Sequence, residues 1–216
     1  MKGEIQNAGY VAFFAALIEG RLKLGQTLTQ EQLCDILGMS LSPLRDTVTL
    51  LEAEGMISIR RKVGITVFYP DAKFFGNTFQ FRGLLEKEGL RKFARIVTPD
   101  WVGRMRREHE DIIRFVGEVN DMNTYRVPVK ELEDRFHNSF VAVFDNDQIM
   151  VNYARLKQKM YILRLTNPES VDPTNTVVSM EEHLAIIDAL ERRDGDAAAD
   201  AMERHLQGVL HRTLTT

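Results

Sequence analysis

Three histidines and one carboxylate fall at inward positions of segments with helical periodicity in the C-terminal half of the chain. Glu133 and His137 are four residues apart, on or beside the apolar face of one predicted helix. His183 and His205 each lie in an apolar row of a later helix. Burying three imidazoles beside a carboxylate is costly unless something pairs with them. A divalent metal ion would do so, because imidazole nitrogen and carboxylate oxygen are its usual ligands.

Helical spacing alone leaves other interpretations of these histidines open. An isolated inward histidine is more often a satisfied core residue than a metal ligand. His109 also lies in an apolar row, with Met105, Ile112 and Val116, so spacing does not exclude it as a ligand. His211 falls off the inward row of its helix, where a solvated side chain is expected. The pattern therefore indicates a metal site without selecting all of its ligands.

These candidate residues belong to a region that is predicted to be entirely helical from Ala72 onward. Thr98-Pro99, Val127-Pro128, Asn167-Pro168, Asp172-Pro173 and Asp194-Gly195-Asp196 interrupt the apolar periodicity. The predicted helices span 72–96, 99–118, 128–144, 147–166, 177–193 and 196–213. Six helices of this length predict an antiparallel bundle.

The stretch from Leu28 to Tyr69 has the pattern of a winged helix-turn-helix. Thr29 and Gln32 have the spacing of a capping box, which predicts a short helix that ends at Gly38-Met39-Ser40. A second helix begins at Ser40 or Ser42, with Pro43 tolerated in its first turn. A preceding helix, from about residue 7 to 20, is expected to support it.

The second helix and the following hairpin predict a DNA-binding surface. Leu44, Val48 and Leu51 form the apolar side of the helix, and polar residues line the opposite side. The two strands, 56–59 and 65–69, are joined by a basic tip at 60–64. A recognition helix in the major groove and a wing against the DNA backbone would use both features. The predicted contacts are Ser40, Ser42, Arg45, Thr49, Arg60, Arg61, Lys62 and Gly64. The pattern would also suit a protein-interaction module.

Size and composition are those of an ordinary globular protein with two domains. The chain has 216 residues, 44% hydrophobic and 27% charged, and we expect domains at 1–71 and 72–216. A net charge of −3 argues against nonspecific coating of nucleic acid, but a local basic patch is enough for specific binding. No apolar run approaches the roughly 20 residues that cross a bilayer, and we expect a cytoplasmic protein without a membrane partner. Cys34 cannot form an internal disulfide.

Three runs in the N-terminal half carry a more specific signature. They are Leu22-x-x-Gly25-x-x-Leu28, Gly38-Met39-Ser40-Leu41-Ser42-Pro43-Leu44-Arg45-Asp46 and Leu50-Leu51-Glu52-Ala53-Glu54-Gly55-Met56-Ile57. Together they resemble the DNA-binding domain of GntR-family bacterial transcription regulators. Arg45 stands at the second arginine of the family's Ser-Arg-Thr-Pro-Val-Arg-Glu segment, whereas Leu41 replaces the first and Glu31 replaces an arginine of some members. The resemblance implies the fold, and these departures prevent transfer of an operator sequence.

Three runs in the helical half carry a second signature: 133–137, 181–190 and 201–206. They resemble the FCD effector domain of the FadR subfamily of GntR regulators, and six helices would suit its VanR-like branch. Metal-binding members share an Asp-x-x-x-His pair, a Glu-His and a late His. The resemblance implies that Glu133, His137, His183 and His205 bind one divalent ion, with Asp134 the alternative to Glu133. Zinc is expected first, and nickel or manganese are alternatives. The resemblance does not include His109.

The family commonly binds a small carboxylate metabolite at this metal. Arg82 matches a family position on the first helix of the bundle and could pair bidentately with a carboxylate. Arg164 is a second candidate for this contact. A structural salt bridge, with Glu86 as the partner of Arg82, is the alternative.

These features together predict a mainly α-helical bacterial transcription regulator rather than an enzyme. We expect a homodimeric repressor that binds a near-palindromic double-stranded operator, with half-site centres separated by about 34 Å or a multiple. A carboxylate effector would shift the bundle between two states and so change DNA binding. The alternatives are a metal-dependent helical enzyme with an appended helix-turn-helix, and a regulator that senses the metal ion itself.

Overall fold

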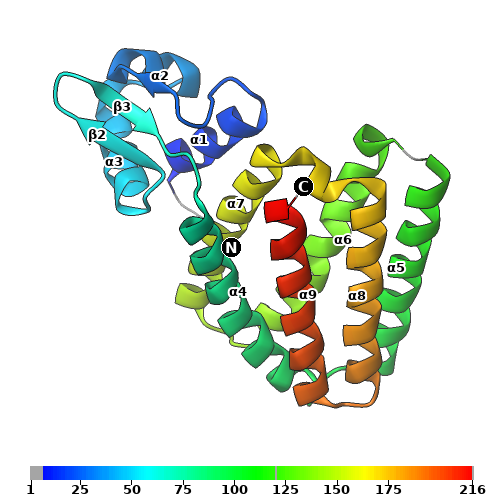
Figure 1. Cartoon of the computed structure of the whole chain (residues 1–216). Helices are drawn as coiled ribbons and strands as arrows, with labels where there is room; N and C mark the ends of the chain where they lie inside the picture. The colour runs from blue at the N-terminus through cyan, green and yellow to red at the C-terminus, as the bar shows by residue number, and fades with distance from the viewer. Residues whose placement is uncertain (1–6, 120, 216) are drawn as a thin grey trace. The chain divides into compact units, whose positions relative to one another are not determined.

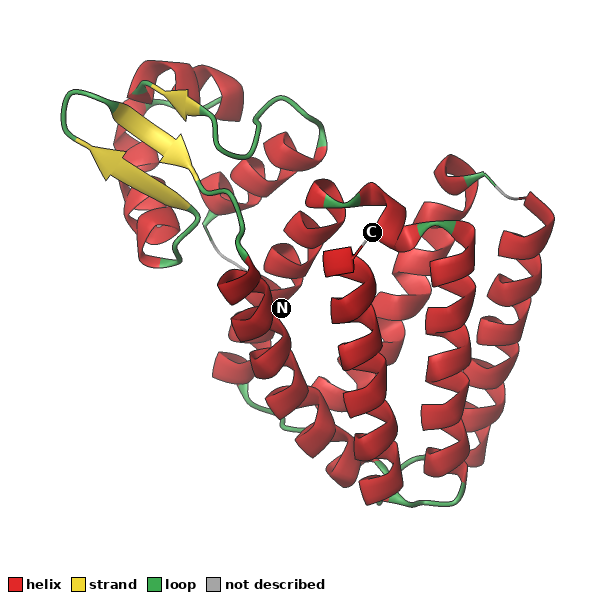
Figure 2. Cartoon of the chain, in the orientation of Figure 1, coloured by secondary structure: helices red, strands yellow, loops and turns green. Residues whose placement is uncertain are grey.

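The computed structural model describes residues 7–119 and 121–215 of the chain (Figure 1). The described chain divides into two compact units, with the boundary in the sequence between Asp71 and Ala72. Helices dominate both units, and the strands are confined to the first (Figure 2). The predicted fold class, a winged helix-turn-helix followed by a helical bundle, is therefore confirmed. Within the described residues, no helix combines the length and apolar character needed to cross a lipid bilayer.

The N-terminal unit contains three helices and a small antiparallel sheet. Its elements are α1 (Ala8–Ile18), β1 (Thr27–Leu28), α2 (Gln30–Leu37), α3 (Leu41–Ala53), β2 (Ile57–Arg60) and β3 (Gly64–Val67). The strand order is β1-β3-β2, with Leu28 opposite Ile65 and Ile59 also opposite Ile65 from the other side. Strand β1 was not predicted, because two residues are too few to show alternation. Its pairing ties the loop before α2 to the wing.

Local signals in the sequence explain why α2 and α3 form where they do. The Thr29 hydroxyl accepts from the Gln32 amide at 3.2 Å, and the Thr29 amide donates to Gln32 Oε1 at 2.8 Å. This capping box begins α2, and Gly38 ends it with φ +66°. Helix α3 begins after the extended residue Ser40. A Cβ on Gly9 would lie 2.0 Å from Thr47 Oγ1, so glycine allows α1 to support α3 closely.

The second unit is a bundle of six α-helices and one short 3-10 helix within the described residues. They are α4 (Ala72–Phe93), α5 (Pro99–Val119), α6 (Met122–Ala142), α7 (Asp147–Thr166), η1 (Pro168–Val171), α8 (Pro173–Glu191) and α9 (Gly195–Thr215). Helix α9 packs between α4 and α8, and α8 packs on α5 (Figure 1). Helix α6 contacts both α4 and α5. The prediction of six helices in the bundle is confirmed for the described residues.

Two predicted helix starts were wrong. Helix α6 begins at Met122 rather than at 128, and Pro128 lies inside it. Asp121 caps the helix by accepting from the Asn123 amide at 3.2 Å, and the buried Tyr125 anchors its first turn, which together outweigh the lost N–H of proline. Helix α8 begins at Pro173 rather than at 177, because Asp172 caps it and proline is tolerated in the first turn.

The core of the bundle lies between α4, α6, α8 and α9. Phe136 and Phe140 of α6 are fully buried and pack against each other with ring centroids 4.7 Å apart. A Cβ on Gly89 would lie 2.1 Å from the Phe140 carbonyl oxygen, so glycine allows α4 to approach α6 closely. Glu86 lies one turn earlier on the same side of α4. The close approach therefore places a carboxylate beside the polar side chains of α6.

Candidate metal centre

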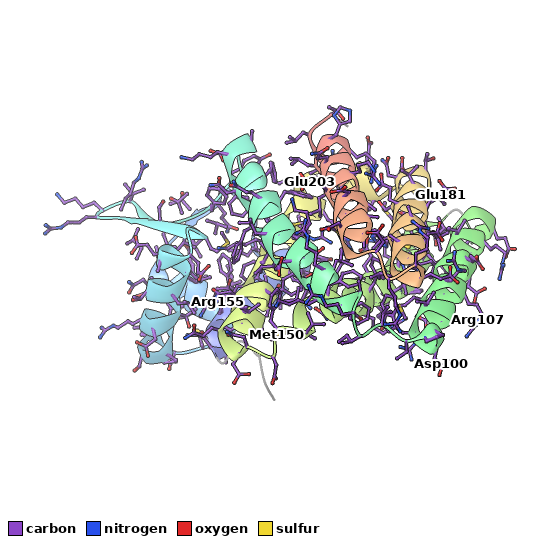
Figure 3. All side chains as sticks on the ribbon, turned by 90° about the horizontal axis from the view of Figure 1, so that it is seen from below. Asp100, Arg107, Met150, Arg155, Glu181 and Glu203 are labelled. Atoms are coloured by element: carbon purple, nitrogen blue, oxygen red, sulfur yellow. The ribbon has the colours of Figure 1, made fainter. Side chains whose placement is uncertain are left out.

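Three histidines from three helices meet in the interior of the bundle. His137 of α6, His183 of α8 and His205 of α9 are 5%, 0% and 2% exposed. One potential ligand nitrogen from each ring lies within 4.8 Å of the other two. His183 Nε2 and His205 Nε2 are 3.3 Å apart. Figure 3 shows that side chains fill the space between the helices, whereas Asp100 and Arg107 of α5 lie at the periphery.

Hydrogen bonds to carboxylates determine which ring nitrogen carries the proton in His137 and in His205. His137 Nδ1 lies 2.9 Å from Glu86 Oε2, and His205 Nδ1 lies 2.7 Å from Glu182 Oε2. An ionised carboxylate can only accept, so both rings donate from Nδ1. A neutral imidazole has one N–H, and therefore Nε2 of His137 and of His205 has a free lone pair.

Glu86 is an ionised carboxylate in the middle of the bundle. Its side chain is 0% exposed, and it accepts from Arg82 Nε at 2.7 Å and from the Tyr153 hydroxyl at 2.6 Å. Burial alone would raise the pKa of Glu86. The charge of Arg82 and the hydrogen bonds from His137 and Tyr153 outweigh burial and hold that pKa far below its usual value. Glu86 therefore remains a hydrogen-bond acceptor for His137 at neutral pH.

Glu182 has the corresponding role beside His205. Arg212 donates through Nη1 to Glu182 Oε1 and through Nη2 to Oε2, both at 2.8 Å. Burial opposes ionisation, but hydrogen bonds from His205 and Arg212 lower the pKa of Glu182 to about 2. A Cβ on Gly208 would lie 2.8 Å from Glu182 Oε1 and 2.9 Å from Arg212 Nη1. Glycine at 208 therefore makes room for this carboxylate and its arginine.

Burial keeps the three central imidazoles neutral. It lowers the pKa of His205 to about 4, despite the opposing effect of Glu182, and it lowers the pKa of His183 well below the usual range. The pKa of His137 is lowered for the same reason, although Glu86 opposes the shift. Neutral imidazole is the form that binds a metal ion.

The donor set fits a divalent ion with tetrahedral preference. His183 Nε2 lies 3.3 Å from the unprotonated His205 Nε2, so either His183 Nε2 donates a proton to it or the two nitrogens share a cation. In a tetrahedral zinc site with Zn–N bonds of about 2.0–2.1 Å, two ligand nitrogens lie about 3.3–3.4 Å apart. The observed distance between His183 Nε2 and His205 Nε2 agrees with that value.

The structure brings together three of the four predicted ligands and gives the fourth another partner. Glu133 of α6 forms an ion pair with Arg164 of α7 and lies outside the group formed by the three histidines. Burial raises the pKa of Glu133, but Arg164 outweighs this effect and lowers it. Asp134, the alternative, accepts from Lys130 at 2.6 Å and is 34% exposed. Whether Glu133 is a ligand stays a prediction.

The two arginines predicted to bind an effector both contact carboxylates, of which Glu86 is fully buried and Glu133 is partly buried. Arg82 pairs with Glu86, as the alternative interpretation expected, and Arg164 pairs with Glu133. The Arg82 side chain retains 11% of its accessible surface, and its hydrogen bond to Glu86 uses only Nε. Four N–H groups of its guanidinium are left for another acceptor. Effector binding by either arginine stays a prediction.

Sequence reasoning missed several partners of the histidines. Glu86 was considered only as a partner of Arg82, although it lies seven residues after Phe79 and four before Leu90 on the buried side of α4. That spacing is the signal that could have found it. Tyr153 gave no comparable signal, because tyrosine is common in cores. His109 was recognised as inward, but its contact with His183 could not be predicted from spacing.

The predicted DNA contacts form an exposed surface on the N-terminal unit. Ser40, Ser42, Arg45 and Thr49 of the α3 region are exposed, as are Arg60, Arg61 and Lys62 at the tip of the wing. Gly64 is partly buried, with φ +120°, and a Cβ there would lie 2.6 Å from the Leu28 carbonyl oxygen. Glycine therefore closes the wing against β1, and its predicted contact with DNA is untested.

An exposed winged helix-turn-helix followed by a separate helical bundle is the arrangement of a class of DNA-binding transcription regulators. Residues 14–67 match the family described as "Bacterial regulatory proteins, gntR family", and residues 77–208 match the family described as "FCD domain". The second match covers more than half of the chain. The chain belongs to the GntR-family transcription regulators that carry an FCD domain, and it is not an enzyme.

Individual relatives support this assignment. The HTH-type transcriptional repressor RspR of Escherichia coli K12 is 25% identical over 186 residues, which cover 86% of this chain and 78% of that protein. The solved structure of McbR/YncC from E. coli has a TM-score of 0.69 at 17% identity and covers 94% of this chain and 95% of its own. The metal-free FCD domain of TM0439 has a TM-score of 0.53 at 21% identity, covering 68% and 95%. The two structures establish similarity of fold.

Proposed function

We propose that this regulator is a repressor controlled by a small carboxylate metabolite that binds at a divalent metal ion held by His137, His183 and His205. The observation that carries the proposal is the convergence of three buried, neutral imidazoles with Nε2 of at least two free of protons. A divalent cation shared by the three rings would use these lone pairs. We propose zinc, one ion per chain.

The metal would supply coordination positions for a carboxylate oxygen, because three protein nitrogens do not fill a tetrahedral or octahedral shell. Arg82 and Arg164 would fix the other oxygens of the effector. Arg164 now pairs with Glu133, and an incoming carboxylate would compete for that arginine. Glu133 released in this way is free to turn toward the ion, which would reconcile its ion pair with its predicted role as a ligand.

In the proposed mechanism the chain acts as a homodimer. The effector signal passes from each bundle to the winged helix-turn-helix, which is bound at one half of a near-palindromic operator. Two copies of α3 would enter the major groove at half-sites about 34 Å or a multiple apart, with the wing cations on the adjacent backbone. An effector that binds one packing of α6, α7 and α8 more tightly biases the bundle toward it. The change in operator affinity is limited by that difference, typically about 1–3 kcal/mol.

The test measures operator retention by the zinc-loaded protein with and without organic acids. An operator fragment selected from random DNA is bound by the full chain, and citrate, malate and gluconate are added as probes. We expect at least one acid to release the DNA from the parent and not from Arg82→Ala. Tighter DNA binding with acid would show an activator-type response. Release or capture of DNA by zinc alone, with no effect of any acid, would replace the proposal with a metal sensor.

A further inference from the structure

His109 of α5 is a fourth buried histidine at the centre, and the proposed metal does not use it. Its ring is 0% exposed and lies against His183, with centroids 5.2 Å apart. Nδ1 of His109 is 2.7 Å from the Met105 carbonyl oxygen, and Nε2 is 3.2 Å from His183 Nδ1. His109 is thus the hydrogen-bond partner of the one central ring that contacts no carboxylate through Nδ1.

The hydrogen bond from His109 to Met105 fixes the proton on the His109 ring. A carbonyl oxygen can only accept, so His109 Nδ1 must carry the N–H. Nε2 of the neutral His109 ring is then an acceptor, so its hydrogen bond with His183 needs the proton of His183 on Nδ1. With that proton on Nδ1, His183 Nε2 is bare. The competing tautomer would carry the proton on His183 Nε2 and donate it to His205 Nε2, 3.3 Å away.

Phe136 holds the same ring from another side. His183 stacks on Phe136 with centroids 4.5 Å apart and planes inclined by 27°, and His109 meets Phe136 edge-on at 4.9 Å. The aromatic face restricts tilting of His183, but it cannot distinguish one ring nitrogen from the other. The contact with His109 favours the proton of His183 on Nδ1, and the contact with His205 favours it on Nε2.

We propose that His109 is a positioning residue for the metal site. It selects the Nδ1–H tautomer of His183 and presents the bare Nε2 to the ion, as Glu86 does for His137 and Glu182 does for His205. His183 differs from the other two ligands because its orienting group is neutral. The inference rests on the proposed metal site, but the tautomer itself exists before any metal binds.

The first experiment reads the tautomer directly in the chelator-treated parent. Nitrogen NMR of the histidine side chains, with His183→Gln used to assign the signals, distinguishes Nδ1–H from Nε2–H rings. We expect the Nδ1–H form for both His109 and His183. An Nε2–H signal for His183 would overturn the proposal. This result does not depend on zinc binding, so failure of the proposed function and failure of this inference are distinguishable.

The second experiment compares zinc affinity, by competition with a chelator, among three variants. His109→Leu removes the acceptor, and loss of such an outer partner typically weakens metal binding about 10–100-fold. His109→Gln retains a side-chain acceptor and should recover most of the affinity. Val116→Ala removes the two terminal methyl groups of a fully buried side chain two turns along the same helix, and it should lower the melting temperature without changing zinc affinity.

Equal affinity of His109→Leu and the parent would contradict the proposal, as would equal weakening in His109→Leu and Val116→Ala. If His109→Leu does not fold, His109→Gln and the tautomer measurement decide. A His109→Gln variant that folds, keeps the Nδ1–H form of His183 and binds zinc supports the role. A variant that folds with His183 in the Nε2–H form but binds zinc like the parent overturns it.

Discussion

The two units of this regulator hold their ionisable side chains in opposite ways. In the N-terminal unit, Arg45 and the wing cations are exposed, where placing a charge costs little. In the bundle, Glu86 and the histidines are buried, and each forms hydrogen bonds with named partners. A buried charge must be satisfied before any ligand arrives. The contrast indicates that the predicted DNA contacts can be changed without loss of stability, whereas the proposed metal centre and the fold are coupled.

The largest expected effect is acid destabilisation of the metal-free protein. The pKa of His205 is about 4 in the folded chain and 6.5 ordinarily, so the unfolded chain binds the proton more readily. The contribution of His205 to the free energy of unfolding is therefore fully present above pH 6.5 and is lost as the pH falls toward 4. The loss from this residue alone is on the order of 3 kcal/mol. Glu182 contributes in the same direction only below pH 4.5. Urea denaturation of chelator-treated protein between pH 7 and 4.5 measures the loss, and a flat profile would contradict it.

A slightly smaller effect is expected when zinc is added to the parent and to His183→Ala. Zinc at 100 times its dissociation constant should stabilise the parent by about 2.7 kcal/mol, because it binds only the folded chain. The variant should gain little, since one of three nitrogens is missing. Thermal denaturation with and without zinc provides the measurement. An equal gain in both proteins would mean that zinc binds outside the three histidines.

Gly208→Ala tests whether the residues that hydrogen-bond to the predicted metal ligands also affect zinc affinity. The new methyl group would displace Glu182 and Arg212, and so release the Nδ1 proton of His205 from its acceptor. We expect zinc affinity to fall about 10–100-fold. The control is Glu203→Gln, which removes the ion pair with Lys87 on the outside of the same helix. Chelator competition should show parent-like affinity for the control, and equal weakening of both would indicate a general effect on α9.

The smallest expected effect on stability comes from the exposed unit. Arg45→Ala should change the free energy of unfolding by less than about 0.5 kcal/mol, because its side chain lies at the surface. The same change should weaken operator binding by about 1–3 kcal/mol if Arg45 contacts a base edge. Denaturation and gel retardation test the two parts separately. A large decrease in the free energy of unfolding of Arg45→Ala would contradict the contrast between exposed and buried ionisable side chains.

Features that depend on neighbours in the sequence could be predicted. The capping box of Thr29 and Gln32 and the end of α2 at Gly38 appear in the structure as expected. Apolar rows also placed His137, His183 and His205 inside the bundle, because a three-and-four spacing fixes which side of a helix is buried. Strand β1 and the helical turns before Pro128 were missed, because they depend on pairing and capping that weak local preferences do not reveal.

Features that depend on contacts between distant helices could not be predicted. Glu86 is 51 residues before His137, and His109 is 74 before His183. Periodicity shows that such a residue faces inward, but it does not show which inward residue it meets. The ion pair of Glu133 with Arg164 has the same origin, since it depends on how α7 packs against α6. The hydrogen bonds that orient the histidines therefore required the structure.

The measurement that tests the central claim most directly is an anomalous difference map, recorded at the zinc edge, from crystals of the full chain grown with zinc. We predict one peak per chain, bonded to Nε2 of His137, His183 and His205 at about 2.0–2.1 Å. Such a peak would show that rings from three helices bind one ion. Zinc located only elsewhere on the chain, with no peak at these three nitrogens, would contradict the account.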